Sequence, residues 1–240
     1  MSVPRLRLAS YNLQKCVGLD LRRRPARSLQ VIEALEADLV VLQEADKRMP
    51  PRPAALPHDM VEDHGWRILP FGQPGGSLGW HGNAMLARPS VEVLATAHLD
   101  LPGLEPRGAI RADVQTSIGP LRVIGTHLGL IRRFRHLQLQ AIMRHLAPLA
   151  PLPTVIAGDF NEWGSPRPLD ALTPGIGIVA TARSFPAPRP VAALDRVAVT
   201  ADLRAAAHGV HIARPARVAS DHLPIWVDLE ATLSPAAATC

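Results

Sequence analysis

The sequence predicts an α/β fold in which mixed β-sheets pack into a sandwich. Apolar runs typical of strands outnumber stretches with helical spacing, and several of these runs follow one another without a helix between them. That order argues against a doubly wound sheet built from β-α-β repeats. The 240 residues suffice for one large α/β domain or two small ones, and 47% of them are hydrophobic, so the chain can bury a substantial core.

Nine segments have the strand pattern, and it continues on both sides of each Pro- and Gly-rich stretch, so we expect loops there rather than domain linkers. The expected strands are residues 6–11, 39–43, 83–87, 91–95, 109–114, 121–126, 154–157, 194–199 and 225–229. The expected loops are residues 49–57, 71–79 and 185–190. We therefore expect a single domain over residues 1–233, followed by a frayed tail at residues 234–240.

Two segments have the periodicity of amphipathic helices. Residues 26–36 place Leu29, Ile32 and Leu35 on one face, and residues 131–146 repeat apolar residues at the same spacing. Strands therefore dominate the predicted fold, which favours a sandwich of mixed sheets over a layered β-α-β arrangement.

The composition is strongly basic. The formal net charge is +5, the pI is about 10.2, and Lys15 and Lys47 are the only lysines, so arginine carries nearly all the positive charge. The codon bias of a GC-rich genome would explain this, but arginine also binds phosphate through two parallel hydrogen bonds. Two arginine clusters, residues 22–24 and 132–135, each follow a candidate catalytic strand, which favours an anionic substrate.

The sequence has only two cysteines, Cys16 and Cys240, which argues against a disulfide framework and favours a reducing cytoplasm. The first residues lack the long apolar segment of a signal peptide. No apolar run approaches the roughly 20 residues of a membrane span. We therefore expect a cytoplasmic protein without a transmembrane segment, and we favour a monomer.

The most informative segment is residues 155–161, where an apolar strand stops at Gly158-Asp159-Phe160-Asn161. In a continuous strand, the side chains of Asp159 and Asn161 would point to the same face and bring a carboxylate and a carboxamide together. A strand followed by an Asx turn explains the segment equally well when it is taken alone. Open α/β sheets, however, carry their chemistry at such strand ends.

Five further strand ends also carry polar groups. They are Asn12, Glu44, His127, Asp195 and the pair Asp221-His222. Each has an ordinary structural explanation of its own, such as a cap or a solvated carboxylate. Six such ends in one chain are hard to explain by chance.

The polar strand ends have a coherent chemistry. Mg²⁺ and Mn²⁺ prefer oxygen ligands. Such ligands are available from Asn12, Glu44, Asp159 and Asp221. The two histidines can act as acids, bases or charge-stabilising groups. The sequence has neither a Cys/His cluster with zinc spacing nor a Gly-rich loop of the Walker type, so the combination favours metal-dependent hydrolysis of a phosphoester.

The order of these motifs resembles the endonuclease/exonuclease/phosphatase superfamily, whose fold is like that of deoxyribonuclease I. The resemblance covers residue 6 to about residue 230, and its most specific elements are Gly-Asp-Phe-Asn at 158–161 and Ser-Asp-His-Leu-Pro at 220–224. The other matching motifs are Asn12, Gln43-Glu44, Gly82 to Arg88, Thr126-His127-Leu128 and Leu194 to Val197. The resemblance implies a four-layer sandwich, with two mixed β-sheets face to face and helices outside.

The resemblance also implies a metal site. Glu44 would be the principal ligand of Mg²⁺ or Mn²⁺, with Asn12 beside it. Asp221 would be a second metal ligand or an acid that acts through water. These residues are compatible with one metal ion or with two.

The remaining residues would carry the hydrolysis. By resemblance, Asp159 would orient or deprotonate the attacking water, and Asn161 would hold a phosphate oxygen. His127 would contact the scissile phosphate, while Asp195 would orient His222, the second catalytic histidine. Either Asp159 or the Asp195–His222 pair would remove the proton from water.

The same motifs would serve small phosphoesters, lipid headgroups and nucleic acids alike. We favour a phosphodiesterase, because the chain is near the minimum length for the fold and only 4% of its residues are aromatic, few for stacking bases. A DNA endonuclease or exonuclease is the close alternative, since the arginine clusters suit a phosphate backbone. A non-catalytic binding module is a third possibility, against which the intact motifs argue. Candidate substrate contacts are Arg107, Trp163 and Arg132.

Overall fold

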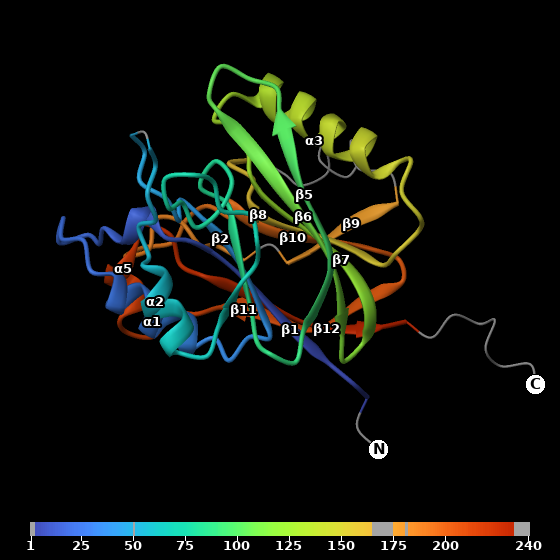
Figure 1. Cartoon of the computed structure of the whole chain (residues 1–240), viewed down its shortest axis with the longest axis horizontal. Coiled ribbons are helices and arrows are strands. Elements are labelled where there is room, and N and C mark those ends of the chain that lie inside the picture. The colour runs from blue at the N-terminus through green and yellow to red at the C-terminus, as the bar shows by residue number, and fades with distance from the viewer. Residues whose placement is uncertain (1–2, 50, 165–174, 181, 233–240) are drawn as a thin grey trace, which may run out of the picture.

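The computed structural model describes residues 3–49, 51–164, 175–180 and 182–232, so the expected tail at residues 234–240 lies outside the described residues. The described strands form two six-stranded mixed sheets, which confirms the predicted fold class. In Figure 1, α3 covers one sheet, and α1, α2 and α5 gather on the other side of the molecule.

The first sheet has β1 and β2 at its centre. Among its described strands these two pair in parallel, and the other neighbours are antiparallel. In sheet order, its strands are β11 (Leu203–Val210), β12 (Ile225–Ala231), β1 (Leu6–Asn12), β2 (Leu39–Gln43), β4 (Ala84–Ala87) and β3 (Arg67–Ile68).

The second sheet repeats this plan, with the parallel pair β7 and β8 flanked by antiparallel neighbours. In sheet order, its strands are β5 (Glu92–Leu101), β6 (Arg107–Thr116), β7 (Gly119–His127), β8 (Thr154–Asp159), β10 (Asp195–Thr200) and β9 (Ile176–Ala180). Each sheet thus has one parallel pair whose two C-terminal ends lie at the same edge.

The two sheets pack face to face over one apolar core. Alternate residues of both sheets are buried there, such as Leu8 and Val41 from the first and Val123 and Val155 from the second. Gly125 of β7 faces β2 of the first sheet, and a Cβ at this position would be 2.8 Å from a methyl group of Val41. The close packing of the two sheets therefore depends on a residue without a side chain at this point.

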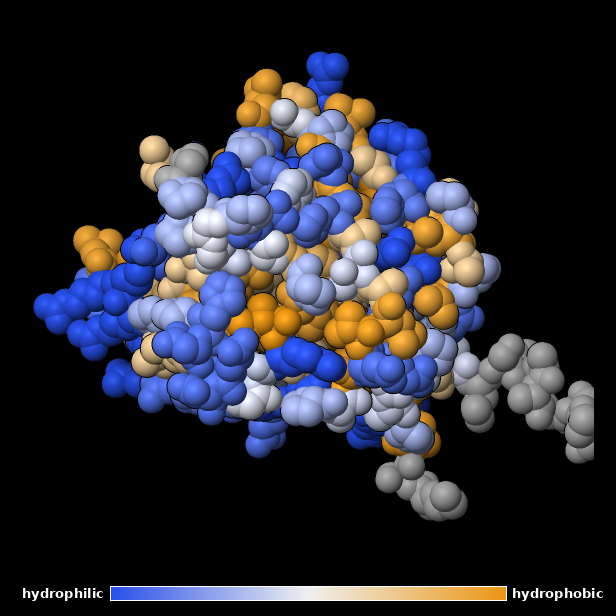
Figure 2. All heavy atoms as spheres, in the orientation of Figure 1, coloured by the Kyte–Doolittle hydropathy of each residue, from blue (hydrophilic) through white to orange (hydrophobic). Residues whose placement is uncertain are grey.

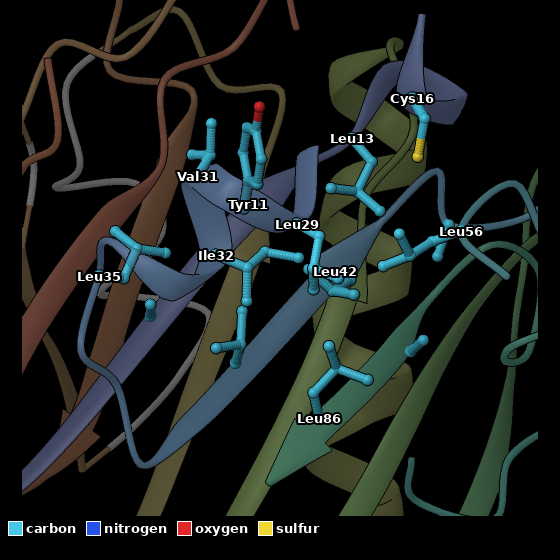
Figure 3. Packing of buried hydrophobic residues seen from close by; sticks show 14 of the residues in the cluster. Tyr11, Leu13, Cys16, Leu29, Val31, Ile32, Leu35, Leu42, Leu56 and Leu86 are labelled. Atoms are coloured by element: carbon cyan, nitrogen blue, oxygen red, sulfur yellow. The ribbon is translucent and has the colours of Figure 1, made fainter. Parts of the chain in front are cut away.

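Helices cover the outer face of each sheet. Leu29 and Ile32 of α1 (Pro25–Glu33) pack on the outer residues of β1 and β2, as Figure 3 shows. Leu139 and Ile142 of α3 (Arg132–Leu146) pack in the same way on the second sheet. The remaining helical segments are short: η1 (Gln14–Cys16), α2 (His58–Asp63) and α5 (Ala216–Ala219). The layers therefore follow the order helix, sheet, sheet, helix.

All nine predicted strands and both predicted helices form, with ends that differ by several residues at most for all except the strand from residue 92, which continues to Leu101. Most residues of this strand are exposed or half-buried, so the strand lacks the apolar pattern from which its full length could be predicted. Three strands, β3, β9 and β11, carried too weak a pattern to be predicted. No helix in the described part of the chain is long and apolar enough to cross a membrane.

The parallel pairs determine where polar groups meet. In β1 and β2, Asn12 is the register partner of Gln43, the residue before Glu44. In β7 and β8, His127 is the register partner of Asp159. Because the sheets pack face to face, these two strand-end pairs lie against each other at one edge of the sandwich.

Candidate active site

An open cleft of about 680 Å³ lies at the edge where the two parallel pairs end. Nine of the candidate site residues line it: Asn12, Glu44, Arg107, His127, Asp159, Asn161, Trp163, Asp221 and His222. Asp195 is fully buried behind the cleft wall. Arg132 is exposed at the start of α3 and is not among the residues that line the cleft, so the predicted contact between Arg132 and substrate has no support in the geometry.

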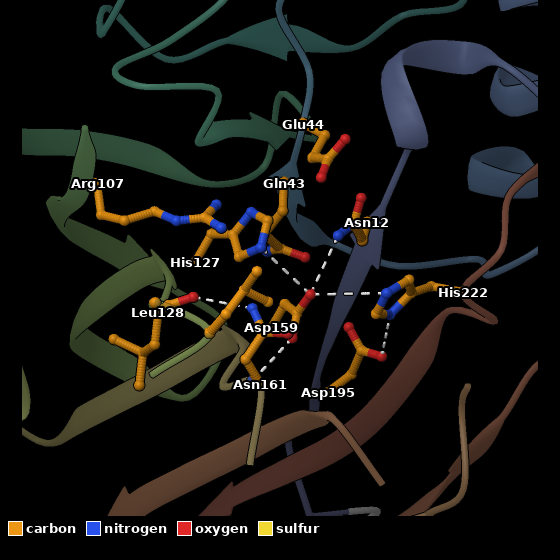
Figure 4. A network of polar contacts seen from close by, with 12 residues as sticks. Asn12, Gln43, Glu44, Arg107, His127, Leu128, Asp159, Asn161, Asp195 and His222 are labelled. Carbon is orange, nitrogen blue, oxygen red and sulfur yellow. Dashed lines mark hydrogen bonds and ion pairs between the residues drawn. The ribbon is translucent and has the colours of Figure 1, made fainter. Parts of the chain in front are cut away.

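Asp159 is the centre of the site. Its Oδ2 accepts a hydrogen bond of 3.1 Å from Asn12 Nδ2, and it lies 3.4 Å from His127 Nε2 and 3.6 Å from His222 Nε2. Figure 4 shows these three side chains converging on one carboxylate oxygen. Burial, together with the nearby carboxylate of Asp195, raises the pKa of Asp159 to about 7.

Asn161 reaches the cleft by a turn rather than by strand alternation. The strand β8 ends at Asp159, whose Oδ1 accepts a hydrogen bond of 2.9 Å from the Asn161 backbone N–H. Asn161 has a left-handed backbone with φ of 51°, and its Nδ2 donates to the Leu128 carbonyl at 2.8 Å. Of the two alternatives that the sequence left open for this segment, the structure therefore has the strand followed by an Asx turn, and this turn brings the Asn161 carboxamide to the cleft.

His222 is held by a buried carboxylate. Its Nδ1 lies 2.8 Å from Asp195 Oδ2, and the same oxygen accepts a hydrogen bond from the Ser184 hydroxyl. Burial alone would lower the pKa of His222, but the charge of Asp195, its hydrogen bond and the charge of Asp159 raise the pKa to about 10. His222 is therefore an imidazolium at neutral pH in the metal-free chain.

His127 is in the opposite state. It is buried, and both burial and the neighbouring cations Arg107 and His222 lower its pKa well below the ordinary value. A neutral imidazole has one N–H donor and one acceptor nitrogen. The cleft thus pairs one neutral histidine with one charged histidine around Asp159.

Glu44, Asn12 and Asp221 supply the oxygen atoms that suit a divalent cation. Glu44 follows β2 with a left-handed φ of 50°, and its carboxylate forms an ion pair with Lys15. Burial raises the pKa of Asp221, and the charge of Glu44 adds to the effect while His222 opposes it. Two carboxylates with an amide oxygen beside them form a donor set that suits Mg²⁺ or Mn²⁺.

A second group of possible ligands consists of Asp159, Asp195 and His222, whose ligand atoms lie within 4.8 Å of one another. Its geometry is better explained by hydrogen bonding. The two ring nitrogens of His222 face different carboxylates, Nδ1 toward Asp195 and Nε2 toward Asp159. One ion could not bind all three groups without replacing the 2.8 Å bond between His222 and Asp195.

The cleft also contains residues that sequence reasoning missed. Lys15, Lys47, Arg48, Arg52, His81 and Phe185 line it, and Ser184 supports Asp195 from behind. Basic residues shortly after Asn12 and Glu44 are a signal that was available in the sequence. Phe185 and Ser184 belong to a loop without periodicity, where no pattern indicates which side chains point inward.

A family model described as the Endonuclease/Exonuclease/phosphatase family matches residues 9–222, and the chain belongs to this family. The match includes every strand end that lines the cleft. Among curated proteins, the chain is 27% identical over 217 residues to the uncharacterized protein YbhP of Escherichia coli strain K12. That match covers 82% of this chain and 85% of YbhP.

Solved structures share the fold across nearly the whole chain. TDP2 from D. rerio, in complex with a single-strand DNA product, has a TM-score of 0.72 at 17% identity and covers 94% of this chain and 99% of that one. A mannosyl-6-phosphatase from Bacteroides thetaiotaomicron has a TM-score of 0.72 at 19% identity, covering 93% of this chain and 99% of that one. At these identities the likeness concerns the fold alone, which is also the deoxyribonuclease I-like fold that the motifs imply.

Proposed function

We propose that the protein is a phosphodiesterase that depends on a divalent metal and hydrolyses its substrate by attack of water on phosphorus. One observation carries this proposal: a single buried oxygen of Asp159 lies 3.1 Å from Asn12, 3.4 Å from His127 and 3.6 Å from His222. Family membership supports hydrolysis of a phosphoester as the general class. That the substrate is a phosphodiester is a more specific proposal than family membership supports.

Asp159 would hold and deprotonate the attacking water. A carboxylate whose pKa is raised to about 7 is a better proton acceptor than an ordinary aspartate. The Asn12 amide and the Asn161 backbone N–H hold the two oxygens of this carboxylate, which restricts the direction it can face. A water bound to Asp159 would therefore approach the substrate along a defined line.

The two histidines and Asn161 would hold the phosphate. The neutral His127 can donate a single hydrogen bond to a phosphoryl oxygen, and Arg107 lies beside it on the cleft wall. The imidazolium of His222, fixed by Asp195, would stabilise the negative charge that develops in the transition state. Because its pKa is raised to about 10, His222 would also be a weak proton donor to a leaving alkoxide.

Glu44, Asn12 and Asp221 would hold the metal ion. When bound, a divalent cation supplies charge that neutralises phosphate oxygens and lowers the pKa of bound water. Lys15 would then lose its ion pair with Glu44 and become available to the substrate.

Turnover of model substrates tests the proposal. Bis-(p-nitrophenyl) phosphate, p-nitrophenyl phosphate, plasmid DNA, abasic duplex and a phospholipid should be compared with Mg²⁺, with Mn²⁺ and with EDTA. We expect metal-dependent hydrolysis of the diester, and losses of several orders of magnitude in Asp159→Asn and His222→Ala at unchanged circular dichroism. Near-native turnover in both variants would contradict the proposal. No turnover of any substrate would favour the binding module.

A DNA endonuclease or exonuclease is the second candidate. The observation that favours it is the set of cations on the cleft wall: Lys15, Lys47, Arg48, Arg52 and Arg107. Such a wall suits several consecutive phosphates. Nicking of plasmid at catalytic enzyme concentrations, with a rate that falls steeply as salt is added, would promote this candidate over the first.

A further inference from the structure

We infer that the protein docks on anionic membrane surfaces through a patch beside the cleft, formed by residues 19–24 and 212–218. The two segments lie side by side, because the Leu19 backbone N–H donates to the Val218 carbonyl at 3.1 Å. Within the second segment, Arg217 Nε donates to the Ile212 carbonyl at 3.1 Å. We call these two segments the basic-apolar patch.

The patch exposes apolar side chains that the rest of the protein does not cover. Leu21 is 87% exposed, Ile212 is 52% exposed, and Leu19 and Val218 are each about two fifths exposed. Leu21 has a left-handed backbone with φ of 57°, a conformation that glycine or asparagine adopts at less cost than leucine. A leucine at this position therefore costs free energy and gains no burial in the chain itself.

The patch is also strongly cationic. Its arginines are all exposed: Arg22, Arg23, Arg24, Arg214 and Arg217. Its one acidic residue, Asp20, forms two hydrogen bonds with Arg27, of 2.9 and 3.0 Å. Since Arg27 neutralises Asp20, the five arginines carry as much formal charge as the net +5 of the whole chain.

An anionic lipid surface is the partner that fits both properties. Arginines gain from the negative potential of such a surface, and exposed leucine, isoleucine and valine side chains gain from entering the boundary between headgroups and acyl chains. A nucleic-acid backbone would explain the arginines but not the strained, exposed leucine. In Figure 1 this part of the chain projects at the left edge, and Figure 2 shows that edge as strongly hydrophilic with an apolar group beside it.

Docking there would bring the cleft close to the lipid. The first segment is joined to the cleft through Lys15, whose backbone carbonyl accepts a hydrogen bond of 3.2 Å from Arg23. The second segment leads directly into Ser220, whose hydroxyl donates to the Asn12 carbonyl at 2.7 Å. Each of the two segments of the patch is therefore linked to a residue near the candidate metal ligands, the first to Lys15 and the second to Ser220.

Vesicle binding tests the inference without any need for turnover. The full chain in EDTA is sedimented with vesicles of equimolar phosphatidylcholine and phosphatidylglycerol, and with vesicles of phosphatidylcholine alone. We expect binding to the anionic vesicles only, weakened roughly tenfold in Leu21→Asn and at least as much in Arg22→Gln/Arg24→Gln. Asparagine tolerates the left-handed backbone, so the first variant should fold.

Matched variants elsewhere on the surface are the controls. Leu94→Asn removes a 53% exposed leucine from β5, and Arg133→Gln/Arg144→Gln removes two exposed arginines from α3. Neither should change vesicle binding. Equal loss in the controls, unchanged binding in the patch variants, or absence of binding to anionic vesicles would overturn the inference.

Two other partners give distinct results. If the arginine variant lost affinity for single-stranded DNA while vesicles did not bind, the patch would be a nucleic-acid surface and the inference would be wrong. Dimers that depend on Leu21 in analytical ultracentrifugation, again without vesicle binding, would reject it in favour of a second copy. Because EDTA abolishes metal-dependent turnover, none of these outcomes depends on whether the protein is a phosphodiesterase.

Discussion

Asp159 and Asp195 are direct register partners across β8 and β10, so two acidic residues lie opposite each other at the edge of the second sheet where β8 ends. Like charges in directly opposed positions destabilise a sheet. Here His222 lies between the two carboxylates, with Nδ1 2.8 Å from Asp195 and Nε2 3.6 Å from Asp159. The fold therefore tolerates the acidic pair through an imidazolium from a loop more than 25 residues further along the chain.

The first prediction concerns the stability cost of Asp159. Its pKa is raised from 3.8 to about 7, so the folded state binds the proton more tightly than the unfolded state. The ionised carboxylate therefore penalises folding, from zero below pH 3.8 to the full amount above about pH 7. In EDTA at pH 8, Asp159→Asn should raise the free energy of unfolding by on the order of 1–3 kcal/mol. In a separate assay with the metal present, the same variant should lose several orders of magnitude of turnover.

Urea unfolding at several pH values checks this prediction. The gain should shrink to nothing as the pH falls from 8 to 4, because Asp159 in the native chain becomes protonated. Asp113→Asn is the control of opposite sign. Asp113 forms a 2.8 Å ion pair with the buried Arg122, so this variant should have a lower free energy of unfolding than the native chain at neutral pH. A destabilised Asp159→Asn at pH 8 would contradict the raised pKa.

The second prediction concerns the two histidines in the metal-free protein. Neither should titrate near pH 6.5, since the pKa of His127 lies well below that value and the pKa of His222 is raised to about 10. A raised pKa means that His222 stabilises the fold fully below pH 6.5, and that this stabilisation is lost as the pH rises through about 10. Ring ¹⁵N shifts should therefore report a neutral His127 and a charged His222 at pH 7.

Asp195→Asn identifies the cause. Loss of this carboxylate should lower the pKa of His222 by at least about one unit and leave the ring of His127 neutral. Titration of His222 in the native chain near its ordinary value, or an unchanged pKa in the variant, would refute the assignment of Asp195 as the group that holds the charge.

The strand ends led to the candidate site because an apolar run and the polar residue that follows it can be recognised in the sequence alone. An apolar run that stops at Asn12, His127 or Asp159, or one residue before Glu44, marks both a strand and its C-terminal end. What the pattern could not contain is the approach of strands far apart in the chain, such as that of Asn12 to Asp159 across 147 positions. That approach depends on how two sheets pack, which is a property of side-chain volumes and not of periodicity.

The arginine clusters were a poorer guide to the candidate site than the strand ends. The cluster at residues 132–135 favoured an anionic substrate, with Arg132 as a candidate contact, yet Arg135 of this cluster is 4% exposed and its Nη2 lies 2.9 Å from the Glu162 carboxylate. Its spacing to Leu139 and Ile142, four and seven residues later, places it on the buried face of α3. The helical period was therefore a better guide than the charge cluster.

The third prediction follows from this buried ion pair. Arg135→Met should lower the free energy of unfolding by about 3–5 kcal/mol, because it leaves the Glu162 carboxylate buried without its partner. Arg132→Gln, on the exposed side of the same helix, should change stability by less than about 0.5 kcal/mol.

A double variant separates the pair from the packing. Arg135→Met/Glu162→Gln removes the unpaired charge but keeps an oxygen for the Gly164 backbone N–H, so it should recover part of the loss. Equal stability of the single and double variants would show that the charge of Glu162 is not the cause.

The last prediction concerns Gly158, the residue that directs Asp159 into the cleft. Gly158 has φ of 150°, and a Cβ at this position would lie 1.9 Å from the Thr126 carbonyl oxygen in the neighbouring strand β7. Alanine could fit only if β7 and β8 moved apart, which would shift both His127 and Asp159. Gly158→Ala should therefore destabilise the fold by more than about 2 kcal/mol and reduce turnover in the fraction that folds.

Gly177→Ala in β9 is the matched control, because a Cβ there would meet nothing within 4 Å. It should change the free energy of unfolding by less than about 0.5 kcal/mol and leave turnover unchanged, since its effect is limited to the entropy of the unfolded chain. Thermal unfolding and turnover of bis-(p-nitrophenyl) phosphate measure both variants. If Gly158→Ala behaved like Gly177→Ala, the contact between Gly158 and Thr126 would not be what holds Asp159 in register with His127.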